Sequence, residues 1–225
     1  MQKEFSNFPQ LYVVIAGQGG AGKEGIAKVT ADYLSVKTGR KSIITREPSD
    51  EFRKKVFTAN KKRASGLVLS EMFYQDGAKV EKTIVQQTLN NGKNVVSVRG
   101  RESTWAYQIP KGISEAEILQ MHRRYLGDFG PDVVIYLCLS DPRIGLERKG
   151  KKLDGDTFDK EDLPYHWAVK KEYDKLATRF AVTSSSIFPT PIFGNWITID
   201  ADRPIKEVRG QVKDLLREYL LLRKK

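Results

Sequence analysis

One glycine-rich turn constrains the fold of this chain more than any other stretch. It reads Gly17-Gln18-Gly19-Gly20-Ala21-Gly22-Lys23-Glu24 and follows the apolar run 11–16. Beyond it, apolar residues at positions 26, 29, 33 and 34 recur with helical spacing. A strand, a glycine-rich turn and a helix in this order are the setting in which backbone N–H groups and a helix N-terminus bind phosphate. The turn therefore predicts an α/β fold with an anion site after its first strand.

The turn matches the pattern G-x-x-x-x-G-K as far as its lysine. The next residue is Glu24, where the pattern has a Ser or Thr whose hydroxyl binds Mg²⁺. A carboxylate is also a hard oxygen ligand, so Glu24 is a candidate metal ligand. Its charge beside Lys23 could instead repel phosphates and leave a weak binder. The predicted phosphate-binding residues are Gly17, Gly20, Ala21, Gly22, Lys23, Glu24 and Gly25.

The rest of the chain alternates apolar runs with helical patterns. Further strands are predicted at 42–45, 95–98, 133–139 and 196–199, and helices at 67–89, 114–128, 159–180 and from 204 onward. The last helix is expected to bury Ile205, Val208, Val212, Leu215, Leu216 and Tyr219. This alternation predicts one domain over residues 1–225, built on a five-stranded parallel sheet flanked by helices. Ligands then belong at the carboxyl ends of the strands.

Three connecting segments carry separate predictions. Segment 49–63 is polar and very basic, which predicts a short helix and a mobile connection. After Leu139, Asp141-Pro142 is interpreted as a turn in a scaffold loop. Segment 147–158, rich in Lys, Gly and Asp, predicts a flexible basic segment.

Composition narrows the class of partner. The formal charge of +11 favours polyanions such as nucleotides, polyphosphate or nucleic acid. The basic residues are spread over many segments, which makes nucleic acid an unlikely partner. The single cysteine, Cys138, excludes a disulfide framework, and His122 and His166 lack the companions of a metal site. No apolar run is long enough to span a membrane and no basic-then-apolar leader is present, so we expect a cytoplasmic protein.

With these elements in order, the chain resembles thymidylate kinases over nearly its whole length. The residues that carry the resemblance are the phosphate loop, Thr45-Arg46-Glu47-Pro48, Asn91-Gly92-Lys93, Arg99, Ser103, Ala106-Tyr107-Gln108, Pro131-Asp132, and Glu161-Asp162-Leu163 with His166. The resemblance implies a P-loop NTPase fold with a short basic lid at about 147–158 and commonly a homodimer. It also implies a phosphotransferase that moves the γ-phosphoryl group of ATP to a (deoxy)nucleoside monophosphate, with Mg²⁺.

The same resemblance assigns roles to individual residues. Catalytic roles fall to Lys23, Arg99 and Arg148, and further lid cations are Lys149, Lys151 and Lys152. The acceptor nucleotide is expected to contact Arg46, Glu47, Pro48, Phe73, Asp76, Arg99, Ser103, Thr104 and Tyr107.

Several positions depart from the family pattern. Gly19 stands where the family has an Asp, Val98 where the third strand ends in an Asp, and Asp156-Thr157 where the lid has Asp-Arg. Asp76 and Ala78 stand where an Arg and a Gln meet thymine, and an acceptor-only carboxylate suits the amino group of another base. Two alternatives therefore stay open. One is a catalytically weak nucleotide-binding protein, and the other is a polyphosphate-dependent nucleotide kinase, which the run Gly22-Lys23-Glu24-Gly25 resembles.

Overall fold

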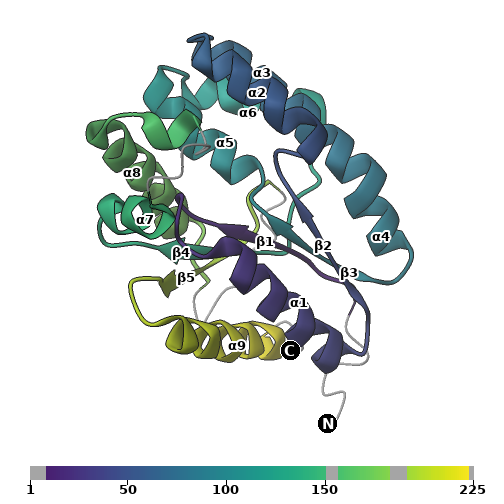
Figure 1. The fold of residues 1–225 in the computed structure, drawn as a ribbon. Helices are drawn as coiled ribbons and strands as arrows, with labels where there is room; N and C mark the ends of the chain where they lie inside the picture. Colours follow the sequence, from purple (N-terminus) through teal and green to yellow (C-terminus); the bar gives the residue numbers. More distant parts are fainter. Residues whose placement is uncertain (1–8, 151–156, 183–191, 223–225) are drawn as a thin grey trace.

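The protein is built on one parallel sheet of five strands. The structure, a computed structural model, describes residues 9–150, 157–182 and 192–222. The strands are β1 (Tyr12–Ala16), β2 (Ser42–Arg46), β3 (Asn94–Val98), β4 (Val133–Cys138) and β5 (Asn195–Asp200). They lie in the order β2-β3-β1-β4-β5, and every neighbouring pair is parallel. The predicted α/β architecture is confirmed (Figure 1).

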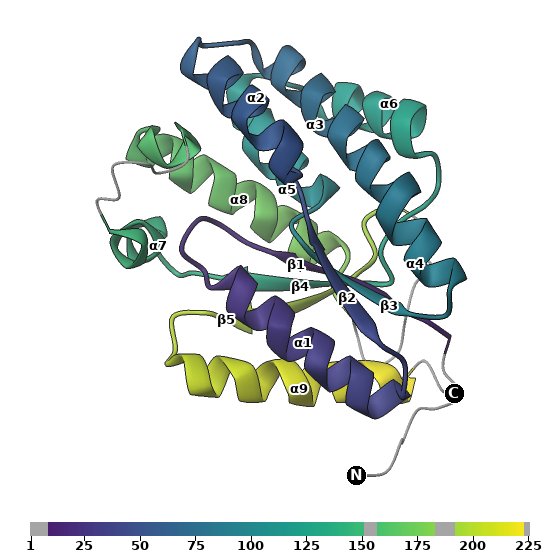
Figure 2. The same ribbon diagram turned by 45° about the vertical axis from the view of Figure 1, so that its right-hand side comes forward.

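Helices cover both faces of the sheet. They are α1 (Lys23–Thr38), α2 (Asp50–Lys61), α3 (Gly66–Val80), α4 (Gln86–Asn90), α5 (Arg101–Gln108), α6 (Glu115–Leu126), α7 (Pro142–Lys149), α8 (Leu163–Arg179) and α9 (Ile205–Leu222). Short helical turns η1 (Glu81–Val85), η2 (Ile109–Lys111) and η3 (Thr157–Lys160) complete the described elements. In Figure 2, α1 and α9 lie on one face and the remaining long helices on the other. No helix in these described ranges is long and apolar enough to cross a membrane.

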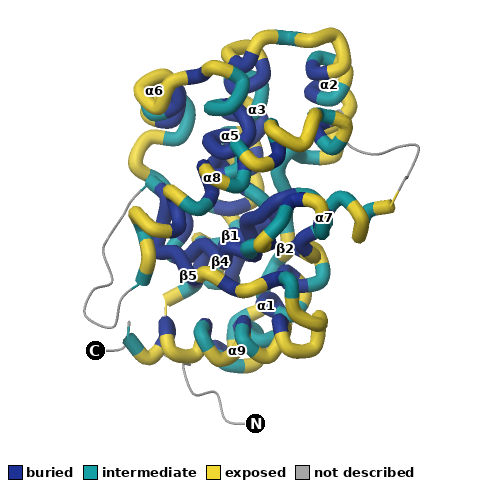
Figure 3. Tube along the Cα trace, turned by 90° about the vertical axis from the view of Figure 1, so that its left-hand side faces the viewer, coloured by how far each residue is buried: buried dark blue, intermediate teal, exposed yellow. Residues whose placement is uncertain are grey.

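Successive side chains of each strand point to opposite faces of the sheet, which divides the core into two layers. Val13 and Ile15 of β1 pack with α1 and α9, whereas Tyr12 and Val14 pack with α3, α5, α6 and α8. Each strand residue points to the face opposite its neighbour, so both layers need apolar side chains. Figure 3 shows the strands as the buried centre of the molecule. The sheet is therefore a rigid base for the loops at its carboxyl edge.

Two segments are more helical than expected, since the sequence predicts a short helix with a mobile connection over 49–63 and a turn at Asp141-Pro142. Residues 50–61 form all of α2, because Ser49 accepts a hydrogen bond from the Phe52 N–H and acidic residues occupy the first turn. Asp141 is not in a turn but caps α7, with Pro142 at the first helical position, where its missing N–H costs nothing. Residues 147–149 thus belong to α7, and residues 151–156 lie outside the described ranges.

Three further features of the helices differ from what the sequence predicts. The helix expected from 159 begins at Leu163, since Asp162 caps it and Pro164 occupies its first turn. The 67–89 helix is a continuous run of α3, the π-helical turn η1 and α4. Ile205 does not join the core as expected, because it is 49% exposed at the first turn of α9.

Candidate functional site

The glycine-rich turn after β1 wraps the N-terminus of α1. Gly17, Gly20 and Gly22 have φ values of 136°, 75° and 88°, which L-residues with side chains rarely adopt. Gly22 is the N-cap of α1 and has no side chain to bond the first-turn N–H groups. Those N–H groups and the positive end of the helix therefore offer an anion site, as the sequence predicts.

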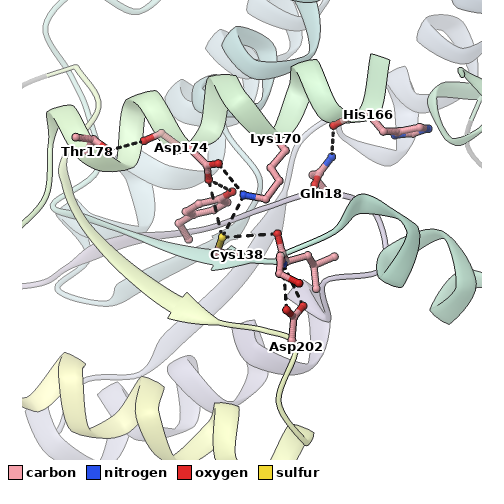
Figure 4. A network of polar contacts seen from close by, with 10 residues as sticks. Gln18, Cys138, His166, Lys170, Asp174, Thr178 and Asp202 are labelled. Atoms are coloured by element: carbon pink, nitrogen blue, oxygen red, sulfur yellow. Dashed lines mark hydrogen bonds and ion pairs between the residues drawn. The ribbon is translucent and has the colours of Figure 1, made fainter. Parts of the chain in front are cut away.

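Lys23 lies inside this turn and is 4% exposed. Its Nζ donates a hydrogen bond to the Gln18 carbonyl at 2.6 Å, and the Gln18 side chain donates in turn to the His166 carbonyl of α8 (Figure 4). Burial, followed by the positive charge of Arg99, lowers the pKa of Lys23 well below its usual value. A backbone carbonyl carries no full charge, so an ammonium held in this way favours an anion beside it.

Glu24 is exposed at the mouth of the turn. Burial of part of its carboxyl raises the pKa, but a backbone hydrogen bond and the charges of Lys23, Arg99 and Arg46 outweigh that effect and lower it. The side chain is therefore ionised at neutral pH. Within the described ranges, no group of three His, Cys, Asp or Glu side chains could hold a metal ion. Mg²⁺ commonly binds through one or two carboxylates, phosphate oxygens and water, so Glu24 fits that ion when a phosphate is also present.

Two adjoining cavities open at the carboxyl edge of the sheet. The first, which we call the phosphate cavity, has a volume of about 280 Å³ and is lined by Gly20, Gly22, Lys23, Glu24, Arg46, Glu47, Pro48, Arg53, Phe57, Val98, Arg99, Arg148 and Lys149. The second, the aromatic cavity, is narrower and is lined by Glu47, Pro48, Phe57, Phe73, Arg99, Gly100, Ser103, Thr104, Tyr107 and Phe158. Both walls include Glu47, Pro48, Phe57 and Arg99.

The aromatic cavity has a volume of about 40 Å³ and three aromatic rings in its wall that contact one another. Phe158 lies with its ring centroid 6.0 Å from that of Phe73 and 5.7 Å from that of Tyr107. The hydroxyls of Ser103 and Thr104 are among the polar groups at the wall. Apolar and aromatic walls with a few placed polar groups are typical of sites for small molecules.

Arg99 stands between the two cavities. Its φ of 69° is uncommon for a residue with a side chain and costs about 1–3 kcal/mol. Its Nη1 donates to the Gly17 carbonyl at 3.4 Å, and its guanidinium lies 5.2 Å from the centroid of the Tyr107 ring. The guanidinium thus contacts the glycine-rich turn on one side and the aromatic cavity on the other.

The structure places most of the sequence-predicted residues at these cavities. Those that line the aromatic cavity are Glu47, Pro48, Phe73, Arg99, Ser103, Thr104 and Tyr107. Arg46 lines the phosphate cavity instead. Gly17, Ala21 and Gly25 belong to the turn and first helical turn but line neither cavity. Lys151 and Lys152 lie outside the described residues.

Asp76 is buried and lines neither cavity. Its two carboxylate oxygens accept hydrogen bonds from the Ser49 N–H at 2.6 Å and the Ser49 hydroxyl at 2.5 Å. Asp76 therefore holds the N-cap of α2 against α3. Each oxygen thus accepts one hydrogen bond within the protein, and the base contact expected of Asp76 stays a prediction.

Arg148 lines the phosphate cavity, but its guanidinium donates hydrogen bonds to backbone carbonyls after β5. Nη1 donates to the Ala201 carbonyl at 2.7 Å and Nη2 to the Asp202 carbonyl at 3.1 Å. The side chain thus holds the loop between β5 and α9. Because Arg148 also lines the cavity that includes Gly20 and Lys23, its expected catalytic role stays a prediction.

Five lining residues were not among the predicted site residues: Arg53, Phe57, Val98, Gly100 and Phe158. Arg53 and Phe57 are four residues apart on α2, and the Arg53 guanidinium lies 5.2 Å from the centroid of the Phe57 ring. That spacing was a usable signal, since residues four apart share one face of a helix. The high content of basic and polar residues in segment 49–63 hides this spacing, because it favours a short helix with a mobile connection.

Glu47 lies in the wall that the two cavities share, and its ionisation makes the stability of the protein depend on pH. Burial is the largest influence and raises its pKa to about 8; Arg101 opposes this rise, and Glu102 and Asp76 add to it. Because the folded protein keeps a proton that the unfolded chain releases near the ordinary pKa of 4.5, stability falls as the pH rises between these values.

We expect Glu47→Gln to remove this dependence. Relative to the variant, the wild-type free energy of unfolding should fall by about 1–3 kcal/mol from pH 5 to pH 9, less than full linkage because Glu47 is partly exposed. Urea denaturation at both pH values measures the difference. The matched control is Glu51→Gln, an exposed carboxyl whose pKa is lowered by its hydrogen bond to Lys79. A Glu47→Gln variant that follows the wild-type pH profile contradicts the assignment.

Comparison with known proteins identifies the family to which this site belongs. The model of the thymidylate kinase family matches residues 15–212, from β1 to within α9. A thymidylate kinase of Cereibacter sphaeroides is 31% identical over 186 residues, which cover 75% of this chain and 82% of that protein. A thymidylate kinase of Vibrio parahaemolyticus is 29% identical over 217 residues, covering 93% and 96% of the two chains. The chain therefore belongs to the thymidylate kinase family.

Proposed function

We propose that this nucleotide kinase family member transfers the γ-phosphoryl group of ATP to a (deoxy)nucleoside monophosphate, with dTMP as the first acceptor to test. The observation that carries the proposal is the shared wall of the two cavities, with Arg99 in contact with the glycine-rich turn and with Tyr107. Such a wall brings a bound phosphate chain and a bound nucleotide to one place. Phosphoryl transfer needs little more than that positioning together with charge neutralisation.

Each group of residues has a part in this reaction. The N-terminus of α1 and Lys23 bind the donor phosphates, and Arg99 draws the acceptor phosphate toward them. The rings of Phe73, Tyr107 and Phe158 hold the acceptor base and exclude water from its faces. When Mg²⁺ is bound, it neutralises and orients the donor phosphate oxygens, and Glu24 is the residue placed to hold it.

The test is an ADP-release assay with ATP and Mg²⁺ against dTMP, dUMP, dCMP, dAMP and dGMP. We expect ADP release that depends on an added monophosphate. Release that proceeds equally well without any acceptor contradicts the proposal. Activity with only another monophosphate supports a kinase whose acceptor is not dTMP. Turnover only with polyphosphate in place of ATP assigns a different donor.

A second candidate is a nucleotide-binding protein with weak catalysis. It is favoured by Glu24, an ionised carboxylate in the phosphate cavity where the loop pattern has a hydroxyl. Two results together favour this candidate over the kinase. Calorimetry detects ATP binding, and no turnover is measured with any acceptor or donor.

Glu24→Ala separates the two roles of this carboxylate. If Glu24 holds Mg²⁺, the concentration of Mg²⁺ for half-maximal activity should rise about tenfold or more, and Glu24→Thr should restore part of the loss. If the charge instead repels phosphate, Glu24→Ala should bind ATP more tightly than wild type. Titration of activity with Mg²⁺, with Glu207→Ala on α9 as the control, distinguishes these opposite outcomes.

A homodimer is part of the same proposal. It is supported by exposed apolar residues on the helical run that follows α2: Leu67 and Val68 are each 49% exposed on α3, and Ile84 is 38% exposed on η1.

A further inference from the structure

Arg99 keeps a backbone conformation that needs support from its surroundings. Its φ of 69° lies in the left-handed region, where a residue with a side chain persists only if neighbouring contacts hold it. The Arg99 N–H donates a hydrogen bond to the Ile15 carbonyl of β1 at 3.0 Å, so the peptide group before Arg99 is fixed by the sheet. The conformation of Arg99 is then decided by what holds the peptide group after it.

Two hydrogen bonds hold that second peptide group, one at each of its polar atoms. The Ser97 hydroxyl donates to the Arg99 carbonyl oxygen at 2.7 Å. The Gly100 N–H donates to Oε1 of Glu102 at 2.9 Å. Because the peptide group is planar, fixing both its oxygen and its N–H fixes its orientation, and with it the φ and ψ angles of Arg99.

The carboxyl group of Glu102 is itself held in one place. Glu102 is 1% exposed, and its Oε1 also accepts a hydrogen bond from the Ser103 hydroxyl at 3.0 Å. The Tyr173 hydroxyl of α8 donates to Ser103 at 2.9 Å, and α8 packs on α5 (Figure 2). Oε2 of Glu102 lies 2.8 Å from the point where a Cβ on Gly100 would be, so a side chain at position 100 would displace the carboxyl group. Glu102 is therefore fixed from α8 on one side and from Gly100 on the other.

Glu102 does not face the ligands, whereas Arg99 does. Glu102 lines neither the phosphate cavity nor the aromatic cavity, and Arg99 lines both. The direction in which a side chain leaves the backbone depends on φ and ψ. A change of Arg99 to negative φ would therefore turn its guanidinium away from the Gly17 carbonyl and from the Tyr107 ring.

We propose that Glu102 is a positioning residue: by accepting the hydrogen bond from the Gly100 N–H, it keeps Arg99 in the left-handed conformation from which the guanidinium reaches both cavities. This inference rests on the proposed function, in which Arg99 draws the acceptor phosphate toward the donor phosphates. Glu102 acts through Arg99 and touches neither nucleotide. Charge that is placed before the reaction stabilises a transition state without reorganisation, so the loss of Glu102 should change the kinetics.

The first test measures kcat and KM with the monophosphate that the wild-type protein uses best. Glu102→Leu should lower kcat/KM for this acceptor about 10- to 100-fold and change the KM for ATP less than about twofold. Glu102→Gln keeps the accepting oxygen and should retain most of the activity. The control is Glu172→Leu, which removes a buried carboxyl group of α8 that accepts hydrogen bonds from Trp105 and Lys175, and it should keep wild-type kcat/KM. Thermal unfolding verifies that each variant is folded.

A double-mutant cycle with Arg99→Met separates positioning from a general loss of structure. If Glu102 acts through Arg99, Glu102→Leu should cause little further loss of kcat/KM in the Arg99→Met protein. Two kinetic results overturn the inference while leaving the proposed function intact. One is wild-type kcat/KM in Glu102→Leu, and the other is a loss that is equally large with Arg99 present and with Arg99 replaced.

A crystal structure of Glu102→Leu tests the inference without any substrate. We expect Arg99 to adopt a negative φ and its guanidinium to leave the Gly17 carbonyl. An Arg99 that keeps its positive φ contradicts the inference. If the wild-type protein turns over no monophosphate, the proposed function fails, and this structure alone decides whether Glu102 positions Arg99. Should Glu102→Leu not fold, Gly100→Ala replaces it in both tests, since a methyl group at position 100 displaces the Glu102 carboxyl group.

Discussion

Lys23→Met is expected to lower kcat by about 10³-fold and to leave the fold intact. Lys23 is the buried ammonium of the glycine-rich turn, and it lies where the first-turn N–H groups of α1 lack a side-chain cap. Charge placed in a water-poor cavity stabilises transferred phosphoryl oxygens far more than charge at the surface does. Methionine keeps the apolar part of the side chain and removes only the positive charge and the N–H hydrogen-bond donors.

The stability of this variant should move in the opposite direction to its activity. Burial of an ammonium is unfavourable, and in Lys23 it lowers the pKa strongly. We therefore expect the free energy of unfolding of Lys23→Met to equal or exceed that of wild type. Lys28→Met, an exposed position on the same helix, is the control and should change neither quantity. A Lys23→Met variant with a tenth or more of wild-type kcat contradicts the role.

Arg101→Met should destabilise the protein by about 3–5 kcal/mol. Arg101 and Glu81 form an ion pair in which each side chain is only 3% exposed, and Arg101 also donates to the Phe129 carbonyl. Loss of the guanidinium leaves the Glu81 carboxylate buried without its counter-charge. The penalty comes from that uncompensated charge more than from the lost attraction.

A double variant tests this explanation. Arg101→Met combined with Glu81→Leu removes both charges, and we expect it to be more stable than Arg101→Met alone. Urea denaturation of the wild type, both single variants and the double variant gives the coupling free energy. Additive losses contradict the buried-charge account. Neither residue lines the phosphate cavity or the aromatic cavity, so the folded fraction of each variant should keep its affinity for nucleotides.

The sheet and the part of the aromatic cavity that follows β3 could be predicted because both depend on local pattern. Short apolar runs such as 133–138 indicate strands directly. In a parallel sheet, the residues that follow the strands all lie at the carboxyl edge of the sheet. Arg99, Ser103 and Tyr107 therefore came together as expected. Their positions follow from strand order alone, not from any long-range contact.

The partners of individual side chains could not be predicted in this way. The position of Asp76 on α3 follows from helical spacing, but nothing near it in the sequence indicates that Ser49 would take both of its oxygens. Arg148 and Lys149 are adjacent cations, and which of them meets the glycine-rich turn depends on the rotation of α7. That rotation is fixed by the contact of Gly145 with Gly19 and Gly20, residues more than a hundred positions away along the chain.

The four residues common to both cavities have a consequence for inhibition. A compound that joins a planar ring to an anionic tail can fill both cavities across Glu47, Pro48, Phe57 and Arg99. It loses translational and rotational freedom once, whereas two separate ligands lose it twice. If the two cavities bind donor and acceptor as proposed, a resistance substitution at any of the four positions would also disturb the binding of both nucleotides. An inhibitor anchored on this wall therefore leaves the protein few substitutions by which to escape it.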